Sequence, residues 1–72
     1  MDSKRLRSVM VLYGDTNAKL ANFLGISEQS LSNKINENGT EFKQNEIAKI
    51  KGRYDLSADL VDLIFFAKKV SN

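Results

Sequence analysis

The sequence contains no cysteine and no histidine among its 72 residues. Without cysteine the chain has neither a disulfide framework nor a thiolate site for zinc. Without histidine it lacks the commonest general base and the commonest nitrogen ligand of metal ions. No glycine-rich phosphate loop replaces them. We therefore reject an enzyme and expect no metal, no cofactor and no small-molecule ligand.

Proline is also absent, and no repeat or low-complexity tract suggests a linker, so we expect a single domain over residues 1–72. Its polar beginning, MDSKRLRS, is unlike a signal peptide, and no apolar run approaches the length of a membrane span. These features predict a soluble cytoplasmic protein without a membrane partner. A domain of this length is close to the smallest that a hydrophobic core can stabilise without crosslinks.

An excess of charge of one sign is missing as well, since the net charge is only +2. Four basic residues, Lys43, Lys49, Lys51 and Arg53, precede an acidic stretch that begins at Asp55. This distribution is compatible with binding a polyanion at selected places. It is equally compatible with an ordinary solvated surface of mixed charge.

What the sequence does contain is helical periodicity. Apolar residues recur at helical spacing in five segments, which predict helices over residues 3–13, 17–24, 28–36, 44–53 and 58–69. Gly14 ends the first segment, and Thr16 and Ser27 can cap the second and third. No segment shows the alternation of a strand with turn residues. The predicted class is all-α with five helices.

Residues 16–36 contain the most informative pattern. Two helices that cross steeply need a small residue at their contact, which Ala21 provides, and a residue that tolerates positive φ between them, which Gly25 provides. Leu20, Leu24 and Leu31 can fill the angle between the helices. Together with the new cap two residues after the glycine, this spacing predicts a helix-turn-helix motif. An ordinary helical hairpin is the alternative.

The segment resembles the helix-turn-helix of the phage Cro and repressor (C1) family, also called the XRE type. The similarity covers residues 6–66 and includes Phe42, Glu46-Ile47, Leu56-Ser57 and Ile64-Phe65-Phe66. Within that family the chain is also similar to the short Cro-like modulators of repression of temperate phages of lactic-acid bacteria. Lys34 departs from the family, in which this position is usually apolar. We expect Ile35 to take the inward role, which suggests a slightly rotated recognition helix.

The resemblance implies a Cro/C1 repressor-like domain that binds operator DNA in a bacterial host and controls a lysis–lysogeny type of switch. In such proteins the second helix of the motif enters the major groove. With Leu31 and Ile35 inward, Gln29 and Asn33 point the opposite way, and both side chains can pair with adenine. The candidate base contacts are Glu28, Gln29, Ser32 and Asn33. Glu28 is explained more simply as a stabiliser of the helix N-terminus.

Candidate phosphate contacts border the same face, because polar and basic side chains there can hold the backbone without reading sequence. They are Asn17, Ser30, Lys34, Asn36, Asn38 and Lys43. Partner chains are expected too: a second copy, giving a homodimer on two half-sites, or the cognate phage repressor. In the second case the chain would be an antirepressor that blocks the repressor's DNA-binding face. The low net charge and Glu28 favour this interpretation, because both weaken binding to DNA by the chain itself.

The last predicted helix has more apolar surface than a single core-facing stripe needs. Leu60, Leu63, Ile64 and Ala67 make such a stripe. Val61, Phe65 and Phe66 then fall outside it, at about 100°, 140° and 240° from Leu60 at 100° per residue. These three residues are the predicted protein interface. The alternative is that the first helix or the end of the chain buries one of the phenylalanines.

Overall fold

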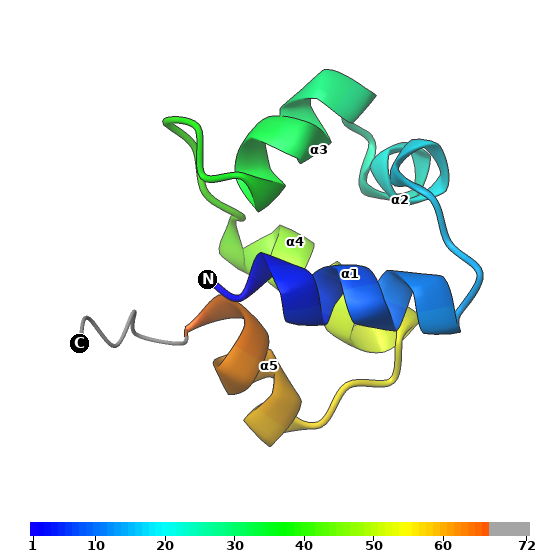
Figure 1. Cartoon of the computed structure of the whole chain (residues 1–72), viewed down its shortest axis with the longest axis vertical. Coiled ribbons are helices and arrows are strands. Elements are labelled where there is room, and N and C mark those ends of the chain that lie inside the picture. The colour runs from blue at the N-terminus through cyan, green and yellow to red at the C-terminus, as the bar shows by residue number, and fades with distance from the viewer. Residues whose placement is uncertain (67–72) are drawn as a thin grey trace.

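The computed structural model describes residues 1–66, and its secondary structure is entirely helical (Figure 1). The five helices are α1 (Ser3–Leu12), α2 (Asn17–Leu24), α3 (Glu28–Ile35), α4 (Gln44–Arg53) and α5 (Ala58–Phe65). No strand occurs in this part of the chain. The predicted all-α class with five helices is confirmed. The predicted continuation of α5 to residue 69 falls beyond Phe65, mostly outside the described residues.

Side-chain caps explain where the helices begin. Thr16, Ser27 and Ser57 each accept a hydrogen bond from the backbone N–H three residues later, at the N-termini of α2, α3 and α5. At α4 the bond runs in the other direction, since the Glu46 carboxylate accepts the N–H of Lys43 at 2.8 Å. These contacts satisfy donors that a helix leaves open in its first turn. The predicted starts at residues 17, 28, 44 and 58 therefore agree with the structure.

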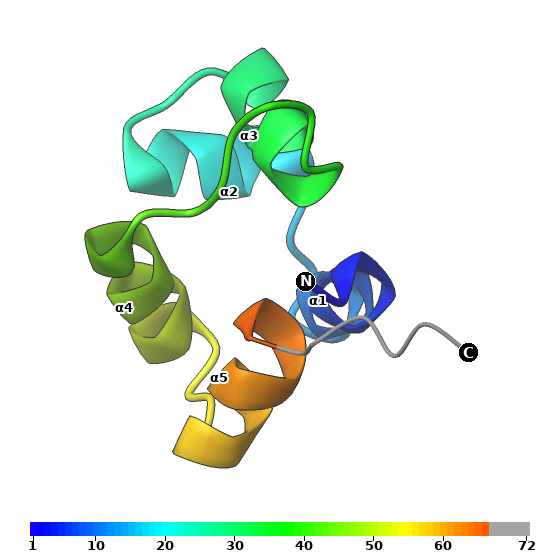
Figure 2. The same cartoon turned by 90° about the vertical axis from the view of Figure 1, so that its left-hand side faces the viewer.

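The helices form two groups that share one core. Helices α2 and α3 pack on each other, whereas α1 and α4 both pack on α5 (Figures 1 and 2). Every helix contributes a side chain with no exposed surface to the core between these groups: Leu6, Leu20, Leu31, Ile50 and Ile64. Burial of such side chains is the main source of stability in a domain of this size. None of the described helices is long and apolar enough to cross a membrane.

Helix α5 is rotated relative to the predicted stripe. Val61, predicted at an interface, is buried with an exposed fraction of 8%, whereas Leu63, predicted in the core, is 46% exposed. The reason is that α5 lies between α1 and α4 and packs on both, so its inward direction lies between Leu60 and Phe65. With apolar residues on most sides of the helix, the sequence alone allowed more than one stripe. Val61 is therefore removed from the predicted interface.

Candidate nucleic-acid interface

Helices α2 and α3 are joined by a short turn, and the geometry of this turn depends on Gly25. Gly25 has φ 75° and ψ 29°, in the left-handed region. No heavy atom lies within 4 Å of where its Cβ would be. The backbone conformation, and not a lack of space, therefore favours glycine. The N–H of Ile26 then donates to the Ala21 carbonyl at 3.0 Å, which closes the C-terminus of α2.

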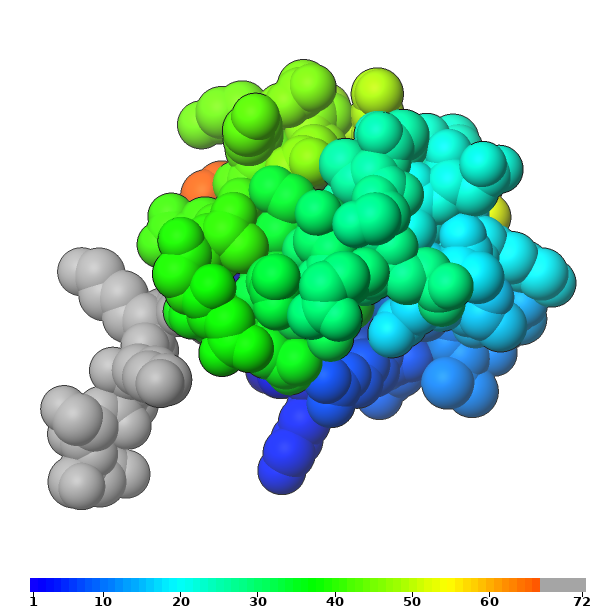
Figure 3. Space-filling view, turned by 90° about the horizontal axis from the view of Figure 1, so that it is seen from above, coloured from blue at the N-terminus to red at the C-terminus, as the bar shows by residue number. Residues whose placement is uncertain are grey.

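Ala21 is buried on the inward side of α2, with an exposed fraction of 2%. Its neighbours on the inward side, Leu20 and Leu24, are also buried, and Leu31 faces them from α3. The predicted positive φ of Gly25 is confirmed, and Ala21 is buried, as its predicted role at a helix contact requires. Figure 3 shows that α2, α3 and the loop after α3 form one continuous face of the molecule.

The outer side of α3 presents amide side chains. Gln29 is exposed, Asn33 is half-buried, and Gln29 Nε2 donates to Asn33 Oδ1 at 3.1 Å. Glu28 is exposed in the first turn and Ser32 is half-buried one turn later. The Gln29–Asn33 bond leaves the Gln29 oxygen as an acceptor and the Asn33 amide nitrogen, with both of its hydrogens, as a donor. An acceptor and a donor side by side are what the major-groove edge of adenine can pair with.

At the other end of α3 the chain brings in a residue from α1. Arg7 Nη2 donates to Asn36 Oδ1 at 3.1 Å, and Asn36 Nδ2 donates to Ser32 Oγ at 3.3 Å. This chain of bonds places a guanidinium beside the outer face of α3. No local pattern marks the contact between Arg7 and Asn36, because 29 positions separate them.

Most of the predicted phosphate contacts lie at the edge of this face. Asn17 is exposed as the first residue of α2, and Asn38 and Lys43 are exposed on the segment between α3 and α4. Ser30 is half-buried, and its hydroxyl accepts a hydrogen bond from Ser27 Oγ at 3.0 Å. Asn17, Asn38 and Lys43 thus remain accessible to a backbone phosphate, and Ser30 is accessible in part.

Lys34 is the exception, because its side chain points into the protein. Its side chain is 9% exposed, and its Nζ lies 3.2 Å from Glu46 Oε1 and donates to the Glu41 carbonyl at 3.1 Å. The prediction that Lys34 contacts phosphate is therefore wrong. The physical reason is that Leu31, Lys34 and Ile35 are neighbours on one side of α3, so that Lys34 turns inward together with Ile35.

The start of the helix pair is held by a second group of charged and aromatic residues. The Arg53 guanidinium donates to both oxygens of Asp15, at 2.6 and 2.9 Å, and the Tyr54 hydroxyl donates to the same carboxylate. Arg53 also lies over the ring of Phe23, 4.5 Å from its centroid. The hydrogen bonds from Arg53 and Tyr54 lower the pKa of Asp15 to about 2. Burial and the nearby carboxylate raise the pKa of Tyr54.

These contacts were not predicted from the sequence. Asp15 and Arg53 are 38 positions apart, and neither belongs to a local motif. The one available signal is that Asp15 lies in the segment between the first two helices, where the sequence predicts a turn residue. Together, Arg53 and Glu46 connect the two ends of α4 to the two ends of the α2–α3 pair.

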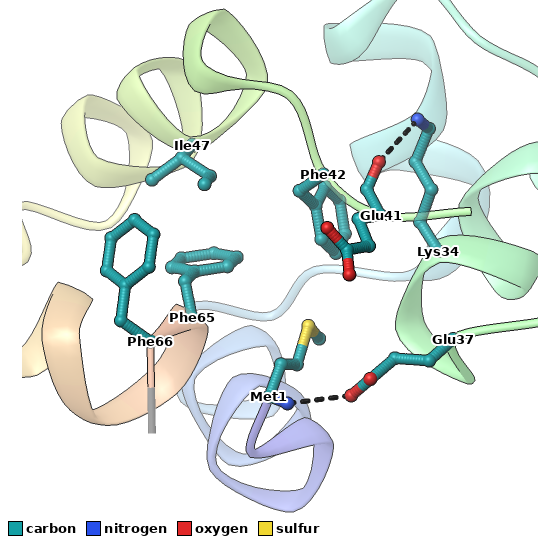
Figure 4. Close-up of a pocket in the computed structure, with 8 residues that line it drawn as sticks. All are labelled: Met1, Lys34, Glu37, Glu41, Phe42, Ile47, Phe65 and Phe66. Carbon is teal, nitrogen blue, oxygen red and sulfur yellow. Dashed lines mark hydrogen bonds and ion pairs between the residues drawn. The ribbon is translucent and has the colours of Figure 1, made fainter. Parts of the chain in front are cut away.

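A cavity of about 140 Å³ lies between residue Met1, the C-terminal part of α3 with the loop that follows it, α4 and the end of α5 (Figure 4). Its apolar wall is formed by Met1, Phe42, Ile47, Phe65 and Phe66, and Lys34, Glu37 and Glu41 form its polar side. Phe65 is half-buried and packs nearly perpendicular to the Phe42 ring, with the two ring centroids 5.5 Å apart, whereas Phe66 is 54% exposed. Of the predicted interface residues, Phe66 is therefore the accessible one and Phe65 is partly covered by its own chain.

Within residues 1–66, no three Asp or Glu side chains gather closely enough to hold a metal ion. No curated protein and no solved structure matches the chain. A family model, by contrast, matches residues 1–68, almost the whole sequence. The chain thus belongs to the family described as "Protein of unknown function (DUF739)".

Proposed function

We propose that this protein is a helix-turn-helix transcriptional regulator of the Cro/C1 type, with α3 as its recognition helix in the major groove of operator DNA. The supporting observation is the arrangement of Gln29 and Asn33. These amides lie on the outer side of α3 and are bonded to each other, which leaves the Gln29 oxygen as an acceptor and the Asn33 amide nitrogen as a donor. A single amide pair held in this way suits an adenine edge.

The surroundings of α3 agree with this proposal. The N-terminus of α2, with Asn17 exposed, can approach a phosphate through its backbone N–H groups. Lys43 and Asn38 border α3 at the other end, and Arg7 lies beside Asn36. Contacts of this kind position a protein on the duplex, and base contacts then provide specificity. In the proposed role, two copies bind two half-sites and control a phage-type genetic switch.

The experiment measures binding to duplex DNA selected from a random library and to a scrambled duplex. We expect Gln29→Ala and Asn33→Ala to cost about 1–3 kcal/mol on the selected site and much less on the scrambled one. Asn22→Ala, which removes an exposed amide from α2, is the matched control and should have little effect on the difference. Equal losses on both duplexes would mean that these amides touch only the backbone.

A second function is supported by the charges on α3. Glu28 is exposed in its first turn, where it repels phosphate, and Lys34 is paired internally with Glu46. Both features weaken attraction to DNA and favour a Cro-like antirepressor that binds a phage repressor instead. Salt separates the two functions, because log K for DNA falls linearly with log salt concentration as counterions are released. An interface between two proteins with an apolar centre should respond far less.

A further inference from the structure

The buried Lys34–Glu46 pair joins α3 to α4. Lys34 Nζ lies 3.2 Å from Glu46 Oε1, and the two side chains are 9% and 7% exposed. The same Nζ donates to the Glu41 carbonyl at 3.1 Å, a contact that is visible in Figure 4. Glu46 in turn accepts the N–H of Lys43 at 2.8 Å. One cation thus connects α3, the loop after it and the first turn of α4.

Such a pair is poorly explained by stability alone. Removing two charges from water is costly, and well-packed apolar residues in place of a buried ion pair often give an equally stable protein. An ion pair differs from apolar packing in being directional: its distances and angles hold for one arrangement of the two helices. Apolar contacts at Leu31 and Ile35 would tolerate a range of rotations of α3, because burial has no preferred direction.

We propose that the Lys34–Glu46 pair fixes the rotation of α3 about its axis and thereby determines which side chains reach the bases. With Leu31 and Ile35 alone inward, the outward direction passes close to Asn33. Including Lys34 among the inward residues turns that direction by about 30° toward Gln29, at 100° per residue. At a helix radius of about 5–6 Å this moves the outer side chains by about 3 Å. A displacement of that size breaks a hydrogen bond to a base.

This inference rests on the proposed function, since it concerns the specificity of DNA binding. In it Lys34 and Glu46 are positioning residues that do not touch DNA. Two consequences follow. The pair should be dispensable for folding when both charges are removed together. It should be indispensable for discrimination between DNA sequences.

The test uses the full chain with the double substitution Lys34→Met and Glu46→Gln. The net charge does not change, so long-range attraction to DNA is preserved. The glutamine oxygen can still accept the N–H of Lys43, which preserves the start of α4. The matched control combines Lys49→Met with Asp62→Asn, two exposed positions on α4 and α5, and also leaves the net charge unchanged.

Two quantities are measured for each protein: the ratio of affinities for the selected and scrambled duplexes, and the orientation of α3 relative to α4 from residual dipolar couplings of backbone amides. We expect the double variant to show a rotated α3 and at least a tenfold smaller affinity ratio, and the control to match the wild type. A double variant that does not fold would contradict the first consequence. Glu46→Asp, which keeps the charge but shortens the side chain, would then test the second consequence and should give a smaller change in the same direction.

An unchanged orientation in a folded variant would overturn the inference, and so would a rotated α3 with an unchanged affinity ratio. Failure of the proposed function has a different signature. In that case the wild type itself would not distinguish the two duplexes, and the dipolar couplings alone would decide whether the pair sets the rotation of α3.

Discussion

Replacing Asp15 by asparagine tests the contact that holds the start of α2 to the end of α4. The Asp15 side chain is 5% exposed and accepts two bonds from Arg53, at 2.6 and 2.9 Å, and one from Tyr54. A pKa of about 2, against an ordinary value of 3.8, corresponds to about 2 kcal/mol of stability at neutral pH. Because Arg53 is 28% exposed and stays partly hydrated, we expect Asp15→Asn to cost about 1–2 kcal/mol.

The cost should depend on pH in one direction. The folded pKa of Asp15 lies below the unfolded one, so its contribution is fully present above about pH 4 and is lost as the pH falls toward 2. The asparagine variant has no proton to gain at this position. Its difference from the wild type should therefore be largest at pH 7 and should shrink toward zero near pH 2.

Thermal unfolding followed by circular dichroism between pH 2 and pH 7 measures this difference. For a domain of this size, 1–2 kcal/mol corresponds to a shift of roughly 5–15 °C in the unfolding midpoint. Asp62→Asn, at an exposed position in α5, is the matched control and should leave the midpoint nearly unchanged at every pH. A difference between Asp15→Asn and wild type that stays constant from pH 2 to pH 7 would refute the assignment of the stabilisation to the ionised carboxylate.

Two further predictions concern packing and self-association. Ala21→Leu should destabilise the domain by about 1–3 kcal/mol in urea denaturation, because Ala21 is buried in the core. Ala18→Leu, at an exposed position of α2, should not, and equal effects of both substitutions would argue against close packing around Ala21. Phe66→Ser should weaken homodimers or a complex with the repressor in analytical ultracentrifugation, because Phe66 is 54% exposed beside the cavity. Leu12→Ser, the control at another exposed apolar residue, should not weaken either association. Unchanged association of folded Phe66→Ser would mean that this residue is not part of an interface.

Much of the fold could be predicted because its signals are local. The hydroxyl caps Thr16, Ser27 and Ser57 and the left-handed glycine at Gly25 act within a few residues of where they stand. They give the beginnings of the helices and the turn between α2 and α3. Helical periodicity gave Leu31 and Ile35 as inward residues, and the amides on the opposite side of α3 followed from that.

The features that sequence reasoning missed depend on partners far away in the chain. From the sequence, Lys34 was predicted to be a surface lysine. Its inward orientation depends on Glu46 and the Glu41 carbonyl, which only the fold brings beside it. The inward side of α5 depended in the same way on where α1 and α4 lie. A helical wheel gives the angles between side chains but not the direction of the core. Where more than one side of a helix is apolar, the neighbouring helices determine which side is buried.

The internal ion pairs bear on how the proposed regulator would bind DNA. Lys34 and Arg53 are matched by Glu46 and Asp15 within the fold, so neither charge is fully available to phosphates. Because the net charge is only +2, non-specific attraction to DNA should be weak, whereas each phosphate contact still adds to the salt dependence of binding. Specific binding would then rest mainly on base contacts from α3, which makes its rotation about its axis more important than in a strongly basic domain. On this view the Lys34–Glu46 pair has two effects: it withholds a positive charge from the DNA phosphates, and it holds α3 in register with the bases.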